Sequence, residues 1–264
     1  MPAGMASALV LAPWILERWG WATLWQLCAV AAAAIAALLL VRVPPDPARG
    51  ADGAPAVRVR ALALDTLRAP GPWLLALCFG LYAGQFIAVF GFLPTAYRDA
   101  GIAPGLAGSL TALGVAVNIL GNVLSGRLVQ HGVGRARLLA GTSVVMAAAA
   151  VAAFGAEFPF GVRYAAVLLL SAVGGVIPGT LFTTAPRFAP YPGAVSTTTG
   201  LMQQGSALGQ FVSPPLVAAV AGASGGWHHT WWVTSAFALV NVVVAVAIGR
   251  LDGRIGERAR PATR

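Results

Sequence analysis

Long uninterrupted runs of apolar residues constrain the fold of this chain more than any other feature. A helix needs about 20 such residues to cross a bilayer, and most of the runs approach that length. Because lipid cannot satisfy backbone polar groups, and because the runs lack the alternation of a barrel strand, each is expected to be a helix. The eight runs are 3–16, 22–41, 73–94, 106–125, 138–155, 164–183, 195–221 and 231–249. The sequence therefore predicts an all-α integral membrane protein with about eight transmembrane helices.

Composition supports a membrane protein and argues against a soluble domain. Apolar residues make up 58% of the chain and charged residues only 9%, with a mean hydropathy of +0.78. A soluble domain is usually about a quarter charged, because charge must cover its core. The lipid bilayer is therefore the first expected partner.

The positions of the arginines indicate orientation. All 17 basic residues are arginine. If the N-terminus lies inside, only Arg18, Arg98 and Arg163 fall in outer connections, which leaves fourteen on the inner side. Cytoplasmic loops carry such an excess. We expect a multi-pass protein of the cell's inner (plasma) membrane with both termini cytoplasmic. The arginines form no stripe that alternates with aromatics, so no nucleic-acid partner is expected.

The sequence contains no pattern that indicates a metal site, a cofactor site or an enzyme active site. Cys28 and Cys78 lie inside apolar runs, where a thiol behaves as a small hydrophobe. His131, His228 and His229 stand in short connections with no Cys or carboxylate at metal-ligand spacing. No phosphate-binding loop, nucleophile elbow or zinc-protease motif is present. The sequence predicts no metal site, no cofactor and no enzyme.

The runs divide the chain into four segments. Residues 1–41 hold two helices, and residues 42–72 form a linker rich in Pro, Gly, Ala and Arg that is expected to be cytoplasmic. Residues 73–249 hold six helices, and residues 250–264 form a basic cytoplasmic tail.

This order resembles the major facilitator superfamily, in which two six-helix halves are joined by a long cytoplasmic loop. Residues 1–41 resemble the fifth and sixth helices of that family, and residues 73–249 resemble helices seven to twelve. The local likenesses are Glu17-Arg18-Trp19-Gly20-Trp21, Phe92-Leu93-Pro94 at the end of the seventh helix, and residues 203–209 in the eleventh.

A short basic connection resembles the family's Gly-x-x-x-Asp-Arg-x-Gly-Arg-Arg motif. It contains Gly126, Arg127, Arg135 and Arg137, but Gln130-His131 stands where the Asp-Arg pair would be. The charge relay proposed for that motif is therefore not expected, whereas Arg135 and Arg137 can still hold the inner ends of helices together.

The resemblance implies a secondary transporter that moves a small solute, with a co-transported ion as a further candidate partner. The first four helices of the family have no counterpart, so a truncated chain is the favoured explanation. A genuine eight-helix protein that pairs with another chain is the alternative. The rival function is a non-transporting scaffold, or an inactive fragment that needs a partner chain. All eight acidic residues lie in connections or at span ends, so no proton-coupling carboxylate is expected within a span.

Neutral polar residues in the middle of the runs are the candidates for the solute pathway. They share helix faces at spacings of three, four or seven residues. They can hydrogen-bond a solute, or they can hold helices together at about 0.6 kcal/mol each. The candidates are Tyr82, Gln85, Asn118, Gln203, Ser206 and Gln210, while Asn122 favours the helix-linking role.

Pairs of glycines four residues apart predict close helix packing, since small residues let backbones approach. They are Gly175 and Gly179 around Pro178, and Gly205 with Gly209. The first pair is also a candidate bend that moves during transport.

Overall fold

The computed structural model describes residues 2–44, 59–155 and 158–258 of the chain. In these residues the regular structure is helical throughout, with no strand. Seven helices are long and apolar enough to cross a membrane. The prediction of an all-α membrane fold is confirmed.

The helices follow one another in a simple order. They are α1 (Pro2–Arg42), α2 (Val59–Arg68), α3 (Pro70–Phe90), α4 (Leu93–Asp99), α5 (Pro104–Gln130), α6 (Arg135–Phe154), α7 (Phe160–Gly174), α8 (Val176–Phe188), α9 (Val195–Ser224) and α10 (Trp231–Arg258), with 3₁₀ turns η2 (Pro192–Ala194) and η3 (Trp227–His229).

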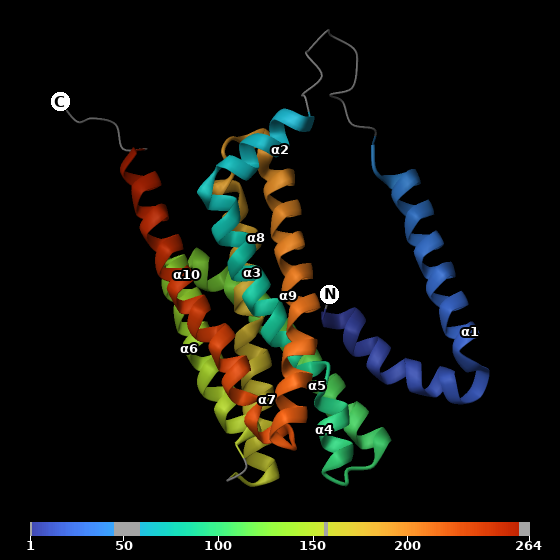
Figure 1. Cartoon of the computed structure of the whole chain (residues 1–264). Helices are drawn as coiled ribbons and strands as arrows, with labels where there is room; N and C mark the ends of the chain where they lie inside the picture. Colours follow the sequence, from blue (N-terminus) through green and yellow to red (C-terminus); the bar gives the residue numbers. More distant parts are fainter. Residues whose placement is uncertain (1, 45–58, 156–157, 259–264) are drawn as a thin grey trace, which may run out of the picture.

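The first two predicted spans lie on the two arms of one kinked helix. Gly20 interrupts α1 with φ 75° and ψ 174°, a conformation that glycine adopts because it has no Cβ. The kink falls between runs 3–16 and 22–41, and Figure 1 shows the two arms diverging from it. This explains why seven long helices are found where eight runs were predicted.

Two other predicted spans are each built from two helices. Run 73–94 is divided between α3 and α4, and run 164–183 between α7 and α8, which meet at Gly175. Pro94 and Pro178 lie in the first turn of the second helix of each pair. A proline there lacks the N–H that would continue the preceding helix, but is tolerated in a first turn.

The helices from α3 to α10 form one bundle, with α1 beside it (Figure 1). Helix α3 packs against α9 and α10, α6 packs against α7 and α10, and α5 packs against α7 and α8. Leu75 and Val89 of α3 and Leu139 of α6 are fully buried in the core. Helix α1 contacts the bundle through α5, and its most apolar segment is not buried inside the structure.

Helix extends into both segments that the sequence assigned to a linker and a tail. Residues 45–58 of the predicted linker lie outside the described residues, but residues 59–68 form α2. Thr66 of α2 hydrogen-bonds Thr197 of α9 at 2.8 Å between their hydroxyl oxygens. At the other end, α10 continues past the predicted limit at residue 249 to Arg258.

Candidate solute cavity

A cavity of about 600 Å³ lies between α3, α5, α8 and α9, with one contribution from α1. It is lined by Met5, Phe79, Tyr82, Ala83, Phe86, Ile87, Asn118, Asn122, Pro178, Phe182, Gln203, Ser206 and Gln210. Ligand pockets for small molecules are commonly about 300–1,000 Å³, so the volume suits a small solute.

Five of the six predicted pathway residues line this cavity. They come from three different helices: Tyr82 from α3, Asn118 from α5, and Gln203, Ser206 and Gln210 from α9. The sixth, Gln85, is not among the lining residues. Its side chain is 1% exposed, and its Nε2 has no hydrogen-bond partner among the described residues.

Asn118 is the centre of a hydrogen-bond network that joins three helices. Its Nδ2 donates to the Tyr82 hydroxyl at 3.0 Å and to the backbone carbonyl of Ser171 on α7 at 2.9 Å. Its Oδ1 accepts from Asn122 Nδ2 at 3.0 Å. The side-chain amide of Asn118 therefore makes its hydrogen bonds to other protein groups. Its main effect is to position the Tyr82 and Asn122 side chains at the cavity wall.

The cavity wall formed by α9 is also polar, but its side chains make fewer hydrogen bonds to the protein than Asn118 does. Gln210 Nε2 donates to Ser206 Oγ at 3.1 Å, one helical turn away. Gln203 is exposed to the cavity. The donors and acceptors of Gln203, Ser206 and Gln210 that make no hydrogen bond to the protein can reach a bound solute.

Aromatic rings form another wall, which the sequence analysis did not identify. Phe79 and Phe182 meet edge to face with ring centroids 5.6 Å apart, and Tyr82 and Phe86 lie 5.9 Å apart. Phe79 and Phe86 precede and follow Tyr82 by three and four residues, so helical spacing from Tyr82 would have found them.

The predicted glycines lie where helices cross most closely around the cavity. A Cβ added to Gly209 would meet the Gly80 carbonyl oxygen at 2.0 Å, and one added to Gly205 would meet the Ala76 oxygen at 2.3 Å. A Cβ on Gly175 would meet the Asn118 oxygen at 2.1 Å, and Gly179 lies against the Ser125 side chain. The backbones of α9 and α3, and of α8 and α5, therefore touch.

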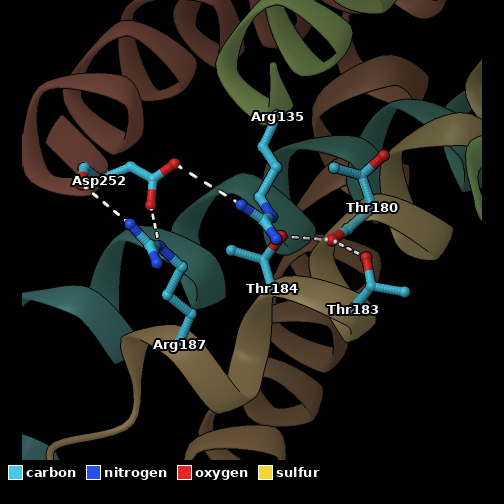
Figure 2. Close-up of polar contacts among 6 residues, drawn as sticks. All are labelled: Arg135, Thr180, Thr183, Thr184, Arg187 and Asp252. Carbon is cyan, nitrogen blue, oxygen red and sulfur yellow. Dashed lines mark hydrogen bonds and ion pairs between the residues drawn. The ribbon is translucent and has the colours of Figure 1, made fainter. Parts of the chain in front are cut away.

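The predicted basic motif begins one helical turn beyond Asn122 of the cavity wall, and its Arg135 lies at the end of the bundle where α10 finishes. Arg135 of α6 and Arg187 of α8 both point toward Asp252 of α10 (Figure 2). The Arg135 Nη1 to Asp252 Oδ2 distance is 3.8 Å, and Arg187 Nε also pairs with this carboxylate. One carboxylate thus ties three helices together.

The other motif residues make no comparable contact. Arg127 lies in the last turn of α5, and Gly126 has open space around it. The structure describes no ion pair of Arg137. In the described residues, no group of three or more His, Cys, Asp or Glu side chains could hold a metal ion.

Comparison with known proteins identifies a family. The family model described as Major Facilitator Superfamily matches residues 1–214. No curated protein sequence matches the chain.

Several solved transporters share the fold. The E. coli fucose:proton symporter FucP is 16% identical with a TM-score of 0.67, over 84% of this chain and 54% of the symporter. A peptide transporter, POT, in complex with sulfate is 16% identical with a TM-score of 0.61, over 71% of this chain and 40% of the transporter. A bacterial homolog of the human lysosomal transporter Spinster, inward-facing and unoccupied, is 17% identical with a TM-score of 0.57, over 100% of this chain and 67% of the homolog. The chain thus spans about half the length of the first two transporters.

Proposed function

Because the chain belongs to the major facilitator superfamily, we propose that it takes part in moving a small solute across a membrane through the cavity between α3, α5, α8 and α9. The observation that carries the proposal is the cavity itself. Residues far apart in sequence, such as Tyr82, Asn118 and Gln203, converge on it from separate helices. Polar side chains that converge on one apolar-walled cavity are typical of a binding site.

Full transport is proposed to need helices beyond those of this chain. Transporters of this fold work by rocking one helical half against the other around a central site. Here α1 contributes a single lining residue, Met5, while α3, α5, α8 and α9 supply the rest. The rival function, a non-transporting scaffold or a fragment dependent on a partner, differs because it does not need water or solute to reach the cavity.

We also propose that the α10 C-terminal end of the bundle faces the cytoplasm of a cell with an inner (plasma) membrane. Arg135 and Arg187 pair with Asp252 near that end, and Arg250 precedes Asp252 by two residues in α10. An arginine excess marks the cytoplasmic side. A co-transported ion would have to bind without a carboxylate from this cavity, because the cavity-lining residues of the described chain include no Asp or Glu.

Reactivity of a single cysteine tests whether the cavity is a solute pathway. Gln210→Cys places a thiol on the cavity wall, in a background where Cys28 and Cys78 are replaced by Ala and Ser. The matched control is Leu208→Cys, two residues along α9, because Leu208 is 63% exposed on the outside of the structure and is not a lining residue. Two helical residues span only about 3 Å, so both thiols lie at nearly the same depth.

The chain is reconstituted in nanodiscs and treated with a charged, water-soluble maleimide. The thiolate is the form that reacts with the maleimide, and it forms readily only where water can solvate its charge. Gln210→Cys should therefore react at least about tenfold faster than Leu208→Cys. Equal or slower labelling of Gln210→Cys would contradict the proposed pathway and favour the scaffold.

A further inference from the structure

We infer that this cavity binds an uncharged solute that presents hydroxyl groups on one side and an apolar face on the other. The inference rests on the proposed function, because it names the class of solute that the same cavity takes. Three observations support it: the charge of the lining, the balance of its hydrogen-bonding groups, and its aromatic wall.

The lining carries no formal charge. Its polar members are Tyr82, two asparagines, two glutamines and Ser206, and the described lining residues include no Asp, Glu, Arg, Lys or His. The ion pairs of the described chain instead gather around Asp252 at the bundle end. Moving an ion out of water is costly unless an opposite charge receives it. A charged solute would gain no such partner from these helices.

The hydrogen-bonding groups left free in the cavity are of both kinds. The Tyr82 hydroxyl accepts from Asn118 and so keeps its own proton for donation, and Ser206 likewise accepts from Gln210. Asn122 uses its Nδ2 on Asn118, which leaves its Oδ1 as an acceptor.

Gln203 adds both a donor and an acceptor, because its side chain is exposed at the cavity and takes part in none of the hydrogen bonds of the described residues. A carboxylate only accepts and an ammonium only donates, whereas a hydroxyl does both. A mixed set of donors and acceptors therefore matches a solute with several hydroxyls.

The aromatic wall supplies the apolar side of the site. Phe79, Phe86 and Phe182 line the cavity together with Ile87. Phe79 and Phe182 make an edge-to-face contact with an interplanar angle of 77°. Such rings bury an aromatic or aliphatic face well. They also attract cations, so a cationic solute is the sharpest rival.

Three aryl sugars that differ at one carbon separate these possibilities. The probes are phenyl β-D-glucopyranoside, phenyl β-D-glucuronide and phenyl 6-amino-6-deoxy-β-D-glucopyranoside, which carry a hydroxymethyl, a carboxylate and an ammonium group at C6. Each is tested for its ability to slow maleimide labelling of Gln210→Cys in nanodiscs. The neutral glucoside should give half-protection at a concentration at least about tenfold lower than either charged analogue. The leucine variant Gln203→Leu in the same background should raise that concentration several-fold, because the solute loses a partner.

Equal protection by the glucuronide or the amino sugar would overturn the inference, and so would no protection by any of the three. In those cases labelling of the unprotected cavity thiol would still support a solute pathway, so the two proposals fail separately. If Gln210→Cys does not fold, Ile87→Cys on the α3 side of the cavity serves as the reporter, with the same expected order of protection.

Discussion

The crossing of α3 and α9 predicts that a single added methyl group at Gly209 destabilises the bundle. A Cβ at this position would stand 2.0 Å from the Gly80 carbonyl oxygen. The obstacle is backbone rather than a flexible side chain, so it cannot rotate away. Restoring an ordinary contact of 3.4 Å requires the two helices to separate by the difference, 3.4 − 2.0 = 1.4 Å.

The energetic result follows from the packing around this crossing. Overpacking a close-packed interior costs about 1–3 kcal/mol. Replacing glycine by alanine in a helix returns up to about 1 kcal/mol through helix propensity. We expect Gly209→Ala to lower the free energy of unfolding by roughly 1–2 kcal/mol.

The matched control is Gly200→Ala in the same helix, where an added Cβ has nothing within 4 Å. It gains helix propensity without a clash, so its stability should stay the same or rise. Both variants are unfolded reversibly by SDS in mixed micelles and followed by tryptophan fluorescence. Equal stabilities of the two variants would refute the close crossing of α3 and α9.

Three further predictions concern the polar groups and the orientation of the bundle. Asn118→Leu should lower the free energy of unfolding by roughly 1–3 kcal/mol, because it removes hydrogen bonds to two other helices. Gln85→Leu should leave the free energy of unfolding unchanged or raise it, because the Gln85 Nε2 is buried without a partner in the described structure. The same SDS titration measures the Asn118 and Gln85 variants, and equal losses of stability in the two would count against the hydrogen-bond network assigned to Asn118. Asp252→Asn should cost about 0.5–1 kcal/mol at low salt and almost nothing at 1 M NaCl, because its ion pairs are partly exposed; a loss independent of salt would show that the pairing is not electrostatic. Cysteines at Gly222 and Gly253, where added side chains meet no atoms, should be labelled from opposite sides of the membrane, with impermeant reagents outside the cell reaching only Gly222.

The membrane-spanning elements could be predicted from sequence because the bilayer leaves little choice. An apolar run of about 20 residues must be helical in lipid, whatever its neighbours are. The break at Gly20, where φ 75° and ψ 174° are not helical, falls between the predicted runs 3–16 and 22–41, whereas the sequence could not show that α10 runs on to Arg258. Helix continuity at polar ends depends on backbone angles, which hydropathy does not encode.

The partner of the basic motif could not be predicted for a different reason. Arg135 was expected to hold helix ends together, and it does contact a carboxylate. That carboxylate, Asp252, lies more than a hundred residues away in sequence and was assigned to a basic tail. Only the packing of α6 against α10 brings the two side chains together. Ion pairs between helices follow from tertiary arrangement, and a single sequence carries no direct record of it.

The placement of Gln85 shows how far helical spacing alone can define a site. Tyr82 and Gln85 are three residues apart, so they share a broad face of α3. At about 100° per residue, however, Gln85 lies about 60° to one side of Tyr82, while Phe86 lies about 40° to the other. The structure places Phe79 and Phe86 on the cavity wall, so Tyr82 stands at the edge of the cavity face and Gln85 lies beyond it. Spacing identifies which residues are neighbours, but the direction in which the face turns is decided by the packing of α3 against α9 and α10.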